Sequence, residues 1–218
     1  MTAPIDLFYW PTPNGKKITI ALEEMGLPYS VQYINIGAGD QFKPEFLAIA
    51  PNNRMPAITD PDGPDGQPLS IFESGAILQY LARKTGKLYG KTERERVATD
   101  QWLMWQMGGV GPMFGQLGFF HKFAGKDFED KRPRDRYVAE SKRLLGVLDQ
   151  RLAGRQWVMG DQYTIADIAI LPWVRNLVGF YGAGDLVEFD QFQEVQRVLT
   201  AFVARPAVAR GLAIPARG

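Results

Sequence analysis

Two short stretches of the chain combine polar side chains with glycine or proline in a way that could do chemistry. The first is the turn at residues 11–16, Pro-Thr-Pro-Asn-Gly-Lys, which lies between an apolar segment and a helical pattern. There the hydroxyl of Thr12, the amide of Asn14 and several unpaired N–H groups gather at a helix N-terminus, and a thiol placed among them would have its anion stabilised by hydrogen bonds and by the helix dipole. We interpret Thr12 and Asn14 as candidates for holding a thiolate. The alternative is that Asn14 only caps the helix and Thr12 packs in the turn.

The second stretch has the features of a site for a peptide end. Pro56 stands just before a short β-branched run, where a cis bond after Met55 would make a tight turn and leave backbone groups for an extended peptide. Further on, residues 69–81 read as a strand that runs into a helix, with Glu73 and Ser74 at the helix start. Free N–H groups, the hydroxyl and the positive end of the helix dipole favour a carboxylate there. The pattern predicts a pocket for a small peptide with a free amino acid end.

The composition excludes several classes of function. The chain has 218 residues, of which 45% are hydrophobic, enough for one large or two modest cores. It has no cysteine, which excludes disulfides, thiolate metal sites and C-x-x-C pairs, so that any thiol must come from the ligand; we predict no metal site. The 25 Lys and Arg balance 24 Asp and Glu without a basic run, so no nucleic acid partner is expected. The sequence shows neither a membrane-spanning stretch nor a signal peptide pattern, and we therefore expect no membrane association and a cytoplasmic protein.

The N-terminal third alternates between strand and helix patterns. Four segments have the apolar or alternating pattern of strands, namely residues 5–10, 29–36, 57–60 and 69–72. Between the first two, apolar residues recur at the spacing of an amphipathic helix, namely Ile18, Ala21, Leu22 and Met25. Gly26 would end this helix, and a strong turn signal at residues 61–66 would join the last two strands as a hairpin. This order predicts an α/β thioredoxin-like domain over residues 1–84, with a right-handed crossover between its first two strands.

The remainder of the chain has helical patterns only. After an expected linker at residues 85–90, we predict an all-α C-terminal domain over residues 91–218. Thr164 and Asp167 have the spacing of a capping box at a helix start, which we interpret as a folding element rather than a catalytic one. The Gly-Gly-Val-Gly-Pro segment at residues 108–112 should interrupt and kink its helix.

These stretches resemble the glutathione transferases. The resemblance rests on a pair of motifs, the Met-Pro-Ala turn at residues 55–57 and the Glu-Ser-x-Ala-Ile-x-x-Tyr-Leu segment at residues 73–81, and it extends over nearly the whole chain. It implies a thioredoxin-like domain followed by an all-helical domain, glutathione as co-substrate and a homodimer.

The turn at residues 11–16 narrows the resemblance. The lack of cysteine excludes the classes that use a Cys nucleophile, and the turn is similar to that of the nu class, the bacterial glutathione-dependent disulfide-bond reductases. Residues 39–47 and 50–53 also look like nu-class segments. In that family the Thr and Asn of the turn contact the glutathione sulfur, which implies catalytic roles for Thr12 and Asn14.

The same resemblance implies residues that bind the rest of glutathione. Gln41 carries over as a glutathione contact, and Met55 would pair through its backbone with the cysteinyl unit. Glu73 and Ser74 would hold the γ-glutamyl end. Arg54 stands where the family commonly has a basic residue, which implies a place near the glycyl carboxylate.

Two further assignments stay open. Arg136 would reach the site of the partner subunit by the same resemblance, but three arginines nearby are alternatives, namely Arg132, Arg134 and Arg143. Tyr9 competes for sulfur activation, because several transferase classes use an N-terminal Tyr hydroxyl; its position inside a strand favours packing. His121 lacks a spaced acidic partner, so we do not interpret it as a general base.

We therefore predict an enzyme that uses the thiolate of bound glutathione to reduce small or mixed disulfides. The alternatives are conjugation or organic peroxide reduction by the same thiolate and, from a different class, a non-catalytic binding or assembly module with this fold. The electrophile stays open, as does binding of one or two glutathione molecules per site. A group of aromatic and methionine residues would line an electrophile pocket or form helical core, namely Met104, Trp105, Met107, Met113, Phe114, Phe119 and Phe120.

Overall fold

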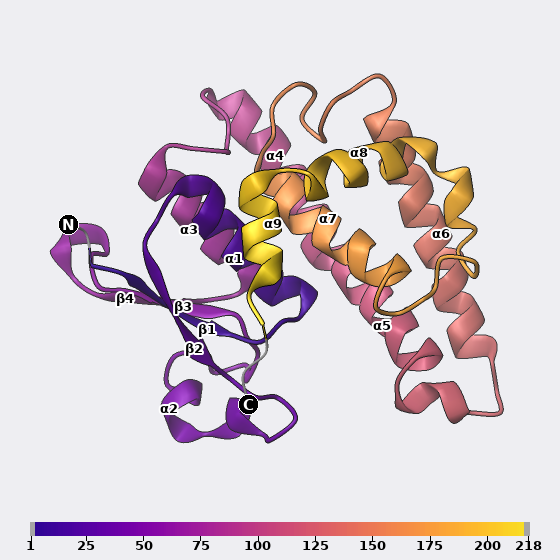
Figure 1. Ribbon diagram of the computed structural model, residues 1–218, viewed down its shortest axis with the longest axis horizontal. Coiled ribbons are helices and arrows are strands. Elements are labelled where there is room, and N and C mark those ends of the chain that lie inside the picture. The colour runs from indigo at the N-terminus through magenta and orange to yellow at the C-terminus, as the bar shows by residue number, and fades with distance from the viewer. Residues whose placement is uncertain (1–2, 216–218) are drawn as a thin grey trace. The chain divides into compact units, whose positions relative to one another are not determined.

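The computed structural model describes residues 3–215 and divides the chain into two compact units (Figure 1). Among these residues, the first unit holds residues 3–87 together with residues 205–215, and the second holds Leu88–Ala204. The first contains a sheet with helices and the second is helical, so the predicted fold class is confirmed.

A four-stranded sheet with the order β2-β1-β3-β4 organises the first unit. Its strands are β1 (Ile5–Tyr9), β2 (Tyr29–Tyr33), β3 (Ala57–Asp60) and β4 (Leu69–Phe72). β1 pairs in parallel with β2 and antiparallel with β3, and β3 pairs antiparallel with β4, which is the predicted thioredoxin-like arrangement. β2 is shorter than the expected residues 29–36. The N–H of Ile34 still bonds to the Tyr9 carbonyl, whereas the N–H of Asn35 turns to the Asp40 carboxylate at 2.9 Å.

The helix α1 (Pro13–Met25) connects the two parallel strands. The predicted apolar stripe is buried, with at most 2% of each side chain exposed, namely Ile18, Ala21, Leu22 and Met25. Gly26 ends the helix in the left-handed conformation at φ 72°, as predicted, and its N–H bonds to the carbonyl of Leu22.

The remaining helices of the first unit are η1 (Asp40–Phe42), α2 (Pro44–Leu47), η2 (Pro64–Gly66), α3 (Ser74–Thr85) and α9 (Pro206–Ala213). The chain end differs from the expected domain range of 91–218, because α9 packs on α1. Gly211 makes this close approach possible, since a Cβ there would lie 2.8 Å from the backbone nitrogen of Ile20. The hydroxyl of Thr19 donates to the Gly211 carbonyl at 2.9 Å, and Arg205 forms an ion pair with Glu24 at 2.6 Å.

The second unit consists of helices, apart from isolated bridges in the part of the chain described. Its helices are α4 (Glu93–Trp105), η3 (Gln106–Val110), α5 (Gly111–His121), η4 (Ala124–Asp127), α6 (Arg132–Leu152), α7 (Ile165–Val178), η5 (Phe189–Gln191) and α8 (Gln193–Val203). The predicted interruption is the π-helical turn η3, and Pro112 follows it in the first turn of α5. In residues 3–215, no helix is long and apolar enough to cross a membrane.

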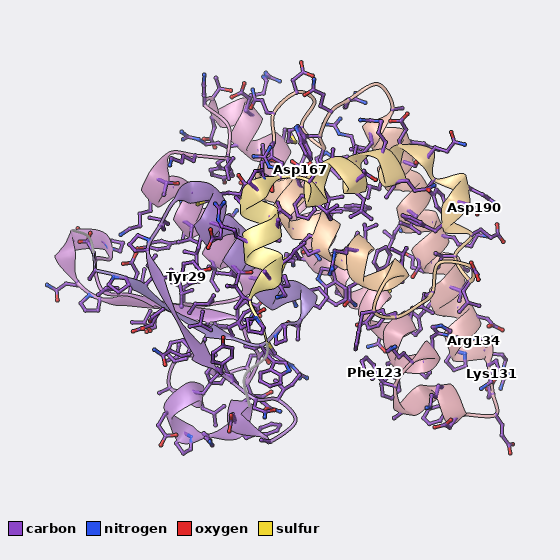
Figure 2. The ribbon with its side chains drawn as sticks, in the orientation of Figure 1. Tyr29, Phe123, Lys131, Arg134, Asp167 and Asp190 are labelled. Carbon is purple, nitrogen blue, oxygen red and sulfur yellow. The ribbon has the colours of Figure 1, made fainter. Side chains whose placement is uncertain are left out.

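The start of α7 carries the predicted capping box. The hydroxyl of Thr164 accepts from the N–H of Ala166 at 3.3 Å, and the Asp167 carboxylate accepts from the N–H of Thr164 at 2.9 Å. Asp167, labelled in Figure 2, is fully buried and also accepts from the N–H of Val158 at 2.8 Å. The structural interpretation of this motif is confirmed.

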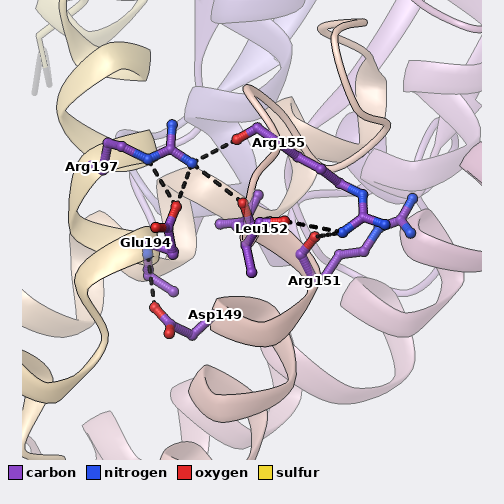
Figure 3. Close-up of polar contacts among 8 residues, drawn as sticks. Asp149, Arg151, Leu152, Arg155, Glu194 and Arg197 are labelled. Atoms are coloured by element: carbon purple, nitrogen blue, oxygen red, sulfur yellow. Dashed lines mark hydrogen bonds and ion pairs between the residues drawn. The ribbon is translucent and has the colours of Figure 1, made fainter.

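Arg197 connects the start of α8 to the end of α6 through hydrogen bonds (Figure 3). Its guanidinium pairs with Glu194 at 2.5 Å and donates to the carbonyls of Leu152 at 3.3 Å and Arg155 at 2.6 Å. These carbonyls lie at and beyond the last turn of α6, where cations are favoured by the helix dipole. Asp149 accepts the N–H of Val195 at 3.0 Å in the first turn of α8.

Candidate active site

Thr12 organises the turn that begins α1. Its N–H donates to the carbonyl of Trp10 at 2.7 Å, and its hydroxyl accepts the N–H of Gly15 at 3.2 Å. Thr12 is therefore the N-cap, and Asn14 lies half-buried inside the first turn. The alternative in which Asn14 caps the helix is wrong, because Thr12 holds the cap position.

Gly15 lets this first turn lie against the end of β1. A Cβ at Gly15 would come within 2.1 Å of the Trp10 carbonyl oxygen and 3.0 Å of the Tyr9 ring. Glycine is therefore required for this close contact, which holds the N-terminal end of α1 at the end of the strand.

The two stretches selected from the sequence meet at Thr12 and Met55. The hydroxyl of Thr12 donates to the sulfur of Met55 at 3.5 Å across 43 positions of sequence. The Met55–Pro56 bond is cis, as predicted. A thioether is a weak acceptor, so a thiolate would be a better acceptor for the same hydroxyl proton. The arrangement thus brings a hydroxyl donor to the turn expected to hold a peptide.

Glu73 and Ser74 lie at the start of α3, as predicted. Glu73 is the N-cap residue, with φ 70° and ψ 114°, a backbone conformation that costs a non-glycine residue about 1–3 kcal/mol and that is common at ligand sites. Its side chain is exposed, whereas Ser74 is only 3% exposed. One carboxylate therefore faces solvent beside a hydroxyl held at the positive end of a helix.

The structure adds Lys17, which sequence reasoning missed. Lys17 is fully buried, and its Nζ donates to the hydroxyl of Ser74 at 3.2 Å. The signal was helical spacing, because Lys17 precedes Ile20 and Ala21 by three and four positions and so shares their buried face. Burial lowers the pKa of the Lys17 ammonium to about 7, against the charge of Glu73, which raises it.

Two predicted glutathione contacts lie on neighbouring loops of the first unit. Gln41 is half-buried in η1, where its Nε2 donates to the Ile36 carbonyl at 3.5 Å, and its Oε1 is buried without a hydrogen bond partner among the described residues. A buried amide oxygen of this kind suits an N–H donor from a ligand. Arg54 is exposed and directly precedes Met55.

Tyr9 uses its hydroxyl within the fold. The ring is fully buried, and the hydroxyl donates to the carbonyl of Ile214 at 3.0 Å. Burial, together with the neighbouring Tyr33 and Tyr29, raises the pKa of Tyr9, which disfavours the phenolate. These features match packing of Tyr9 rather than sulfur activation.

In residues 3–215, no group of three His, Asp or Glu side chains could hold a metal ion.

Arg136 belongs to the second unit, where it is exposed on α6. The three alternative arginines each hold a carboxylate, with N–O distances of 2.7 Å for Arg132 and Asp130, 2.8 Å for Arg134 and Asp135, and 2.7 Å for Arg143 and Glu140. Arg136 makes no ion pair with any residue that the structure describes. Of the four, it is therefore the arginine whose charge is most available to another molecule.

The aromatic and methionine residues considered for an electrophile pocket do not share one environment. Phe114 belongs to the core with 1% exposure, whereas Met104 and Phe119 are 50% and 38% exposed. Phe120 stacks on Tyr137, with ring centroids 5.7 Å apart. The group is thus divided between core and surface.

This architecture, a thioredoxin-like unit and a helical unit, is the one that the sequence predicted for a glutathione transferase. Family models agree over both units of the chain. The model described as Glutathione S-transferase, N-terminal domain, matches residues 12–84, and the model described as Glutathione S-transferase, C-terminal domain, matches residues 112–206. The chain belongs to the glutathione S-transferase family.

Three proteins illustrate what the chain is similar to within this family. Disulfide-bond oxidoreductase YfcG of Escherichia coli (strain K12) is 52% identical over 172 residues, covering 78% of this chain and 79% of that protein. A glutathione transferase of Burkholderia graminis, crystallised with two glutathione molecules per subunit, is 65% identical, with a TM-score of 0.96 over 99% of this chain and 90% of that one. A glutathione transferase of Pseudomonas putida, crystallised with one glutathione disulfide per subunit, is 63% identical, with a TM-score of 0.95 over 97% of this chain and 92% of that one.

Proposed function

We propose that this protein binds glutathione in its first unit and uses the glutathione thiolate to reduce small or mixed disulfides. The contact of Thr12 with Met55 carries the proposal, because it joins a hydroxyl donor at a helix N-terminus to a turn suited to an extended peptide. Since the chain has no cysteine, the nucleophilic sulfur comes from the ligand. The name of the Escherichia coli relative and the glutathione disulfide held by the Pseudomonas putida relative support the same reaction.

In the proposed complex the glutathione lies between α3 and the cis-proline turn. The hydroxyl of Ser74 and the first N–H groups of α3 bind the γ-glutamyl carboxylate, and the exposed carboxylate of Glu73 binds the amino group. The backbone of Met55 pairs with the cysteinyl unit. The buried Oε1 of Gln41 accepts a peptide N–H, and Arg54 binds the glycyl carboxylate.

Thr12 and Asn14 act on the sulfur. The Thr12 hydroxyl, which already donates to a sulfur atom, donates to the thiolate instead, and the amide of Asn14 and the dipole of α1 add to its stabilisation. Lowering a thiol pKa by about two units corresponds to about 2.7 kcal/mol. Two or three charge-assisted hydrogen bonds supply an energy of that size.

The reaction balances with two glutathione molecules per disulfide. The first thiolate attacks one sulfur of the substrate disulfide, forms a mixed disulfide and releases a substrate thiolate. The second glutathione thiolate attacks the glutathione sulfur of that mixed disulfide, which yields glutathione disulfide and the second substrate thiolate. The two protons lost by glutathione end on the two product thiols. The two glutathione molecules bound per subunit of the Burkholderia graminis relative match this stoichiometry.

We also propose that the protein belongs to the nu class, forms a homodimer and is located in the cytoplasm. The Thr12 turn supports nu-class membership, and the unpaired charge of Arg136 supports a homodimer in which this side chain reaches the glutathione of the partner subunit. A cytoplasmic location follows from the chemistry, because that compartment keeps glutathione reduced.

A stoichiometric assay tests the proposed reaction. With 2-hydroxyethyl disulfide and glutathione, we expect one glutathione disulfide and two mercaptoethanol molecules per substrate, and no mass increase of the intact protein. Faster turnover of 1-chloro-2,4-dinitrobenzene would favour conjugation, and faster turnover of cumene hydroperoxide would favour peroxide reduction. A protein that is not retained on immobilised glutathione would support the non-catalytic alternative.

A further inference from the structure

Lys17 is a buried lysine at the contact between α1 and α3. Its side chain has no exposed surface, and its ammonium lies 3.2 Å from the Ser74 hydroxyl. Burying an ammonium group is unfavourable unless the group is paired. An apolar side chain of similar length would fill the same volume without that cost. Packing alone therefore does not account for a lysine at this position.

The hydrogen bond to Ser74 has a direction that bears on ligand binding. A serine hydroxyl has one donor and two acceptor positions, and Lys17 occupies one acceptor position. The O–H of Ser74 therefore points away from the Lys17 ammonium. A carboxylate accepts hydrogen bonds and donates none, so it requires the hydroxyl in this orientation.

The charges of Lys17 and Glu73 are also arranged for an amino acid end. Glu73 is exposed at the N-cap of α3, and its negative charge favours the ammonium form of Lys17. The site thus presents a negative group at the surface and, in the ammonium form of Lys17 that a bound carboxylate would favour, a positive group bonded to Ser74. A free amino acid end carries the opposite pair, an ammonium and a carboxylate, and complementary charges of this kind select a ligand and fix its orientation.

We propose that Lys17 is a positioning residue for the α-carboxylate of the γ-glutamyl end: it orients the Ser74 hydroxyl and places a buried positive charge behind it. This inference rests on the proposed function, because it assumes that glutathione occupies the start of α3. Lys17 does not touch the sulfur or the disulfide, and its effect is on glutathione affinity rather than on the chemical step.

Two ligands and one substitution test this role by calorimetry. The ligands are glutathione and its analogue 4-aminobutyryl-cysteinyl-glycine, which lacks only the α-carboxylate. Lys17→Met should weaken binding of glutathione by about ten- to a hundredfold, the effect of losing one charge-assisted interaction, and change binding of the analogue by less than about twofold. In the disulfide assay, KM for glutathione should rise by the same factor, while kcat at saturating glutathione stays within about twofold.

Lys87→Met is the matched control. Lys87 lies in the same unit and donates to the Met25 carbonyl at 2.7 Å, at the other end of α1. This variant should bind both ligands as the unchanged protein does. Should Lys17→Met fail to fold by circular dichroism, Lys17→Gln keeps a hydrogen bond donor without the charge and should show the same selective loss for glutathione.

The outcomes separate this inference from the proposed function. Equal weakening of both ligands would make Lys17 a structural residue only and overturn the proposal, as would unchanged glutathione affinity. If the unchanged protein binds neither ligand, the glutathione site itself is refuted.

Discussion

Thr12 combines two tasks in one side chain. Its oxygen accepts the N–H of Gly15 and so caps α1, while its proton points to the sulfur of Met55. The Thr12 oxygen accepts the capping hydrogen bond, and the hydroxyl proton donates the other one. The capping bond therefore fixes the hydroxyl in place without occupying its proton. A serine could perform both tasks, whereas an alanine could perform neither.

We expect Thr12→Ala to lower kcat/KM for disulfide reduction by about 10- to 100-fold, which is about 1.4–2.7 kcal/mol of lost transition-state stabilisation, with little change in glutathione affinity. Loss of the cap should also lower the free energy of unfolding by about 1 kcal/mol. Thr12→Ser should retain most of both. Steady-state kinetics across pH and urea unfolding measure these effects. A larger kinetic loss in Tyr9→Phe would move the activating hydroxyl to Tyr9.

At the start of α3, Glu73→Ala and Ser74→Ala should each weaken glutathione binding by about 1.5–3 kcal/mol, the range for a lost charge-assisted hydrogen bond. The reason is that each variant removes one group expected to hold the amino acid end. Isothermal titration calorimetry measures the change, with Glu45→Ala, a change at an exposed side chain on α2, as control. Unchanged affinity in both site variants would contradict the binding mode.

Among the elements, α7 depends on a carboxylate placed deep in the second unit. Asp167 accepts hydrogen bonds from the N–H groups of Val158 and Thr164, and so joins the preceding loop to the first turn of the helix. Burial raises the pKa of Asp167 to about 6, an effect larger than the opposing one of these N–H groups. The contribution of Asp167 at the start of α7 to the free energy of unfolding therefore depends on pH.

Aspartate in an unfolded chain titrates near about 3.9, so between that pH and about 6 the folded state binds more protons than the unfolded state. The contribution of Asp167 to the free energy of unfolding should therefore fall as pH rises from about 4 to about 6, by about 3 kcal/mol in total. We expect the difference in unfolding free energy between the unchanged protein and Asp167→Asn to show this fall. Urea unfolding at fixed protein concentration from pH 4 to 7 measures it. A difference that is constant with pH would mean that Asp167 titrates as in an unfolded chain.

At the scale of the whole molecule, the proposed dimer would bring Arg136 to the glutathione of the partner subunit. An exposed arginine without an ion pair in the described chain contributes little to its own unit. A two-fold dimer would use it twice, once in each site.

Sedimentation should therefore show a dimer at micromolar concentration. Arg136→Ala should remain dimeric and weaken glutathione binding by about tenfold, because a charged contact from the partner is lost. Arg143→Ala, in which the arginine already paired with Glu140 is removed, should bind glutathione normally. A protein that is monomeric throughout the micromolar range would rule out a contribution from the partner.

The sequence by itself determined the features that depend on neighbours within a few residues. The capping box of Thr164 and Asp167, the helix end at Gly26 and the buried stripe of α1 follow from local propensity and periodicity, and the structure has all three. The sequence also marked the Met55–Pro56 bond as one whose cis form would make a tight turn, and the bond is cis. The candidate groups at Thr12, Asn14, Glu73 and Ser74 came from residue chemistry at two helix starts, their roles toward glutathione came from family resemblance, and those roles stay predictions.

Only the tertiary structure decided which distant segments meet. The bond from Thr12 to Met55 spans 43 positions, that from Lys17 to Ser74 spans 57, and that from Thr19 to Gly211 spans 192. Local patterns cannot encode such pairs, because they arise when whole elements pack and their side chains must fit one volume. For this reason the burial of Lys17 could be read from its spacing on α1, whereas its contact with Ser74 could not.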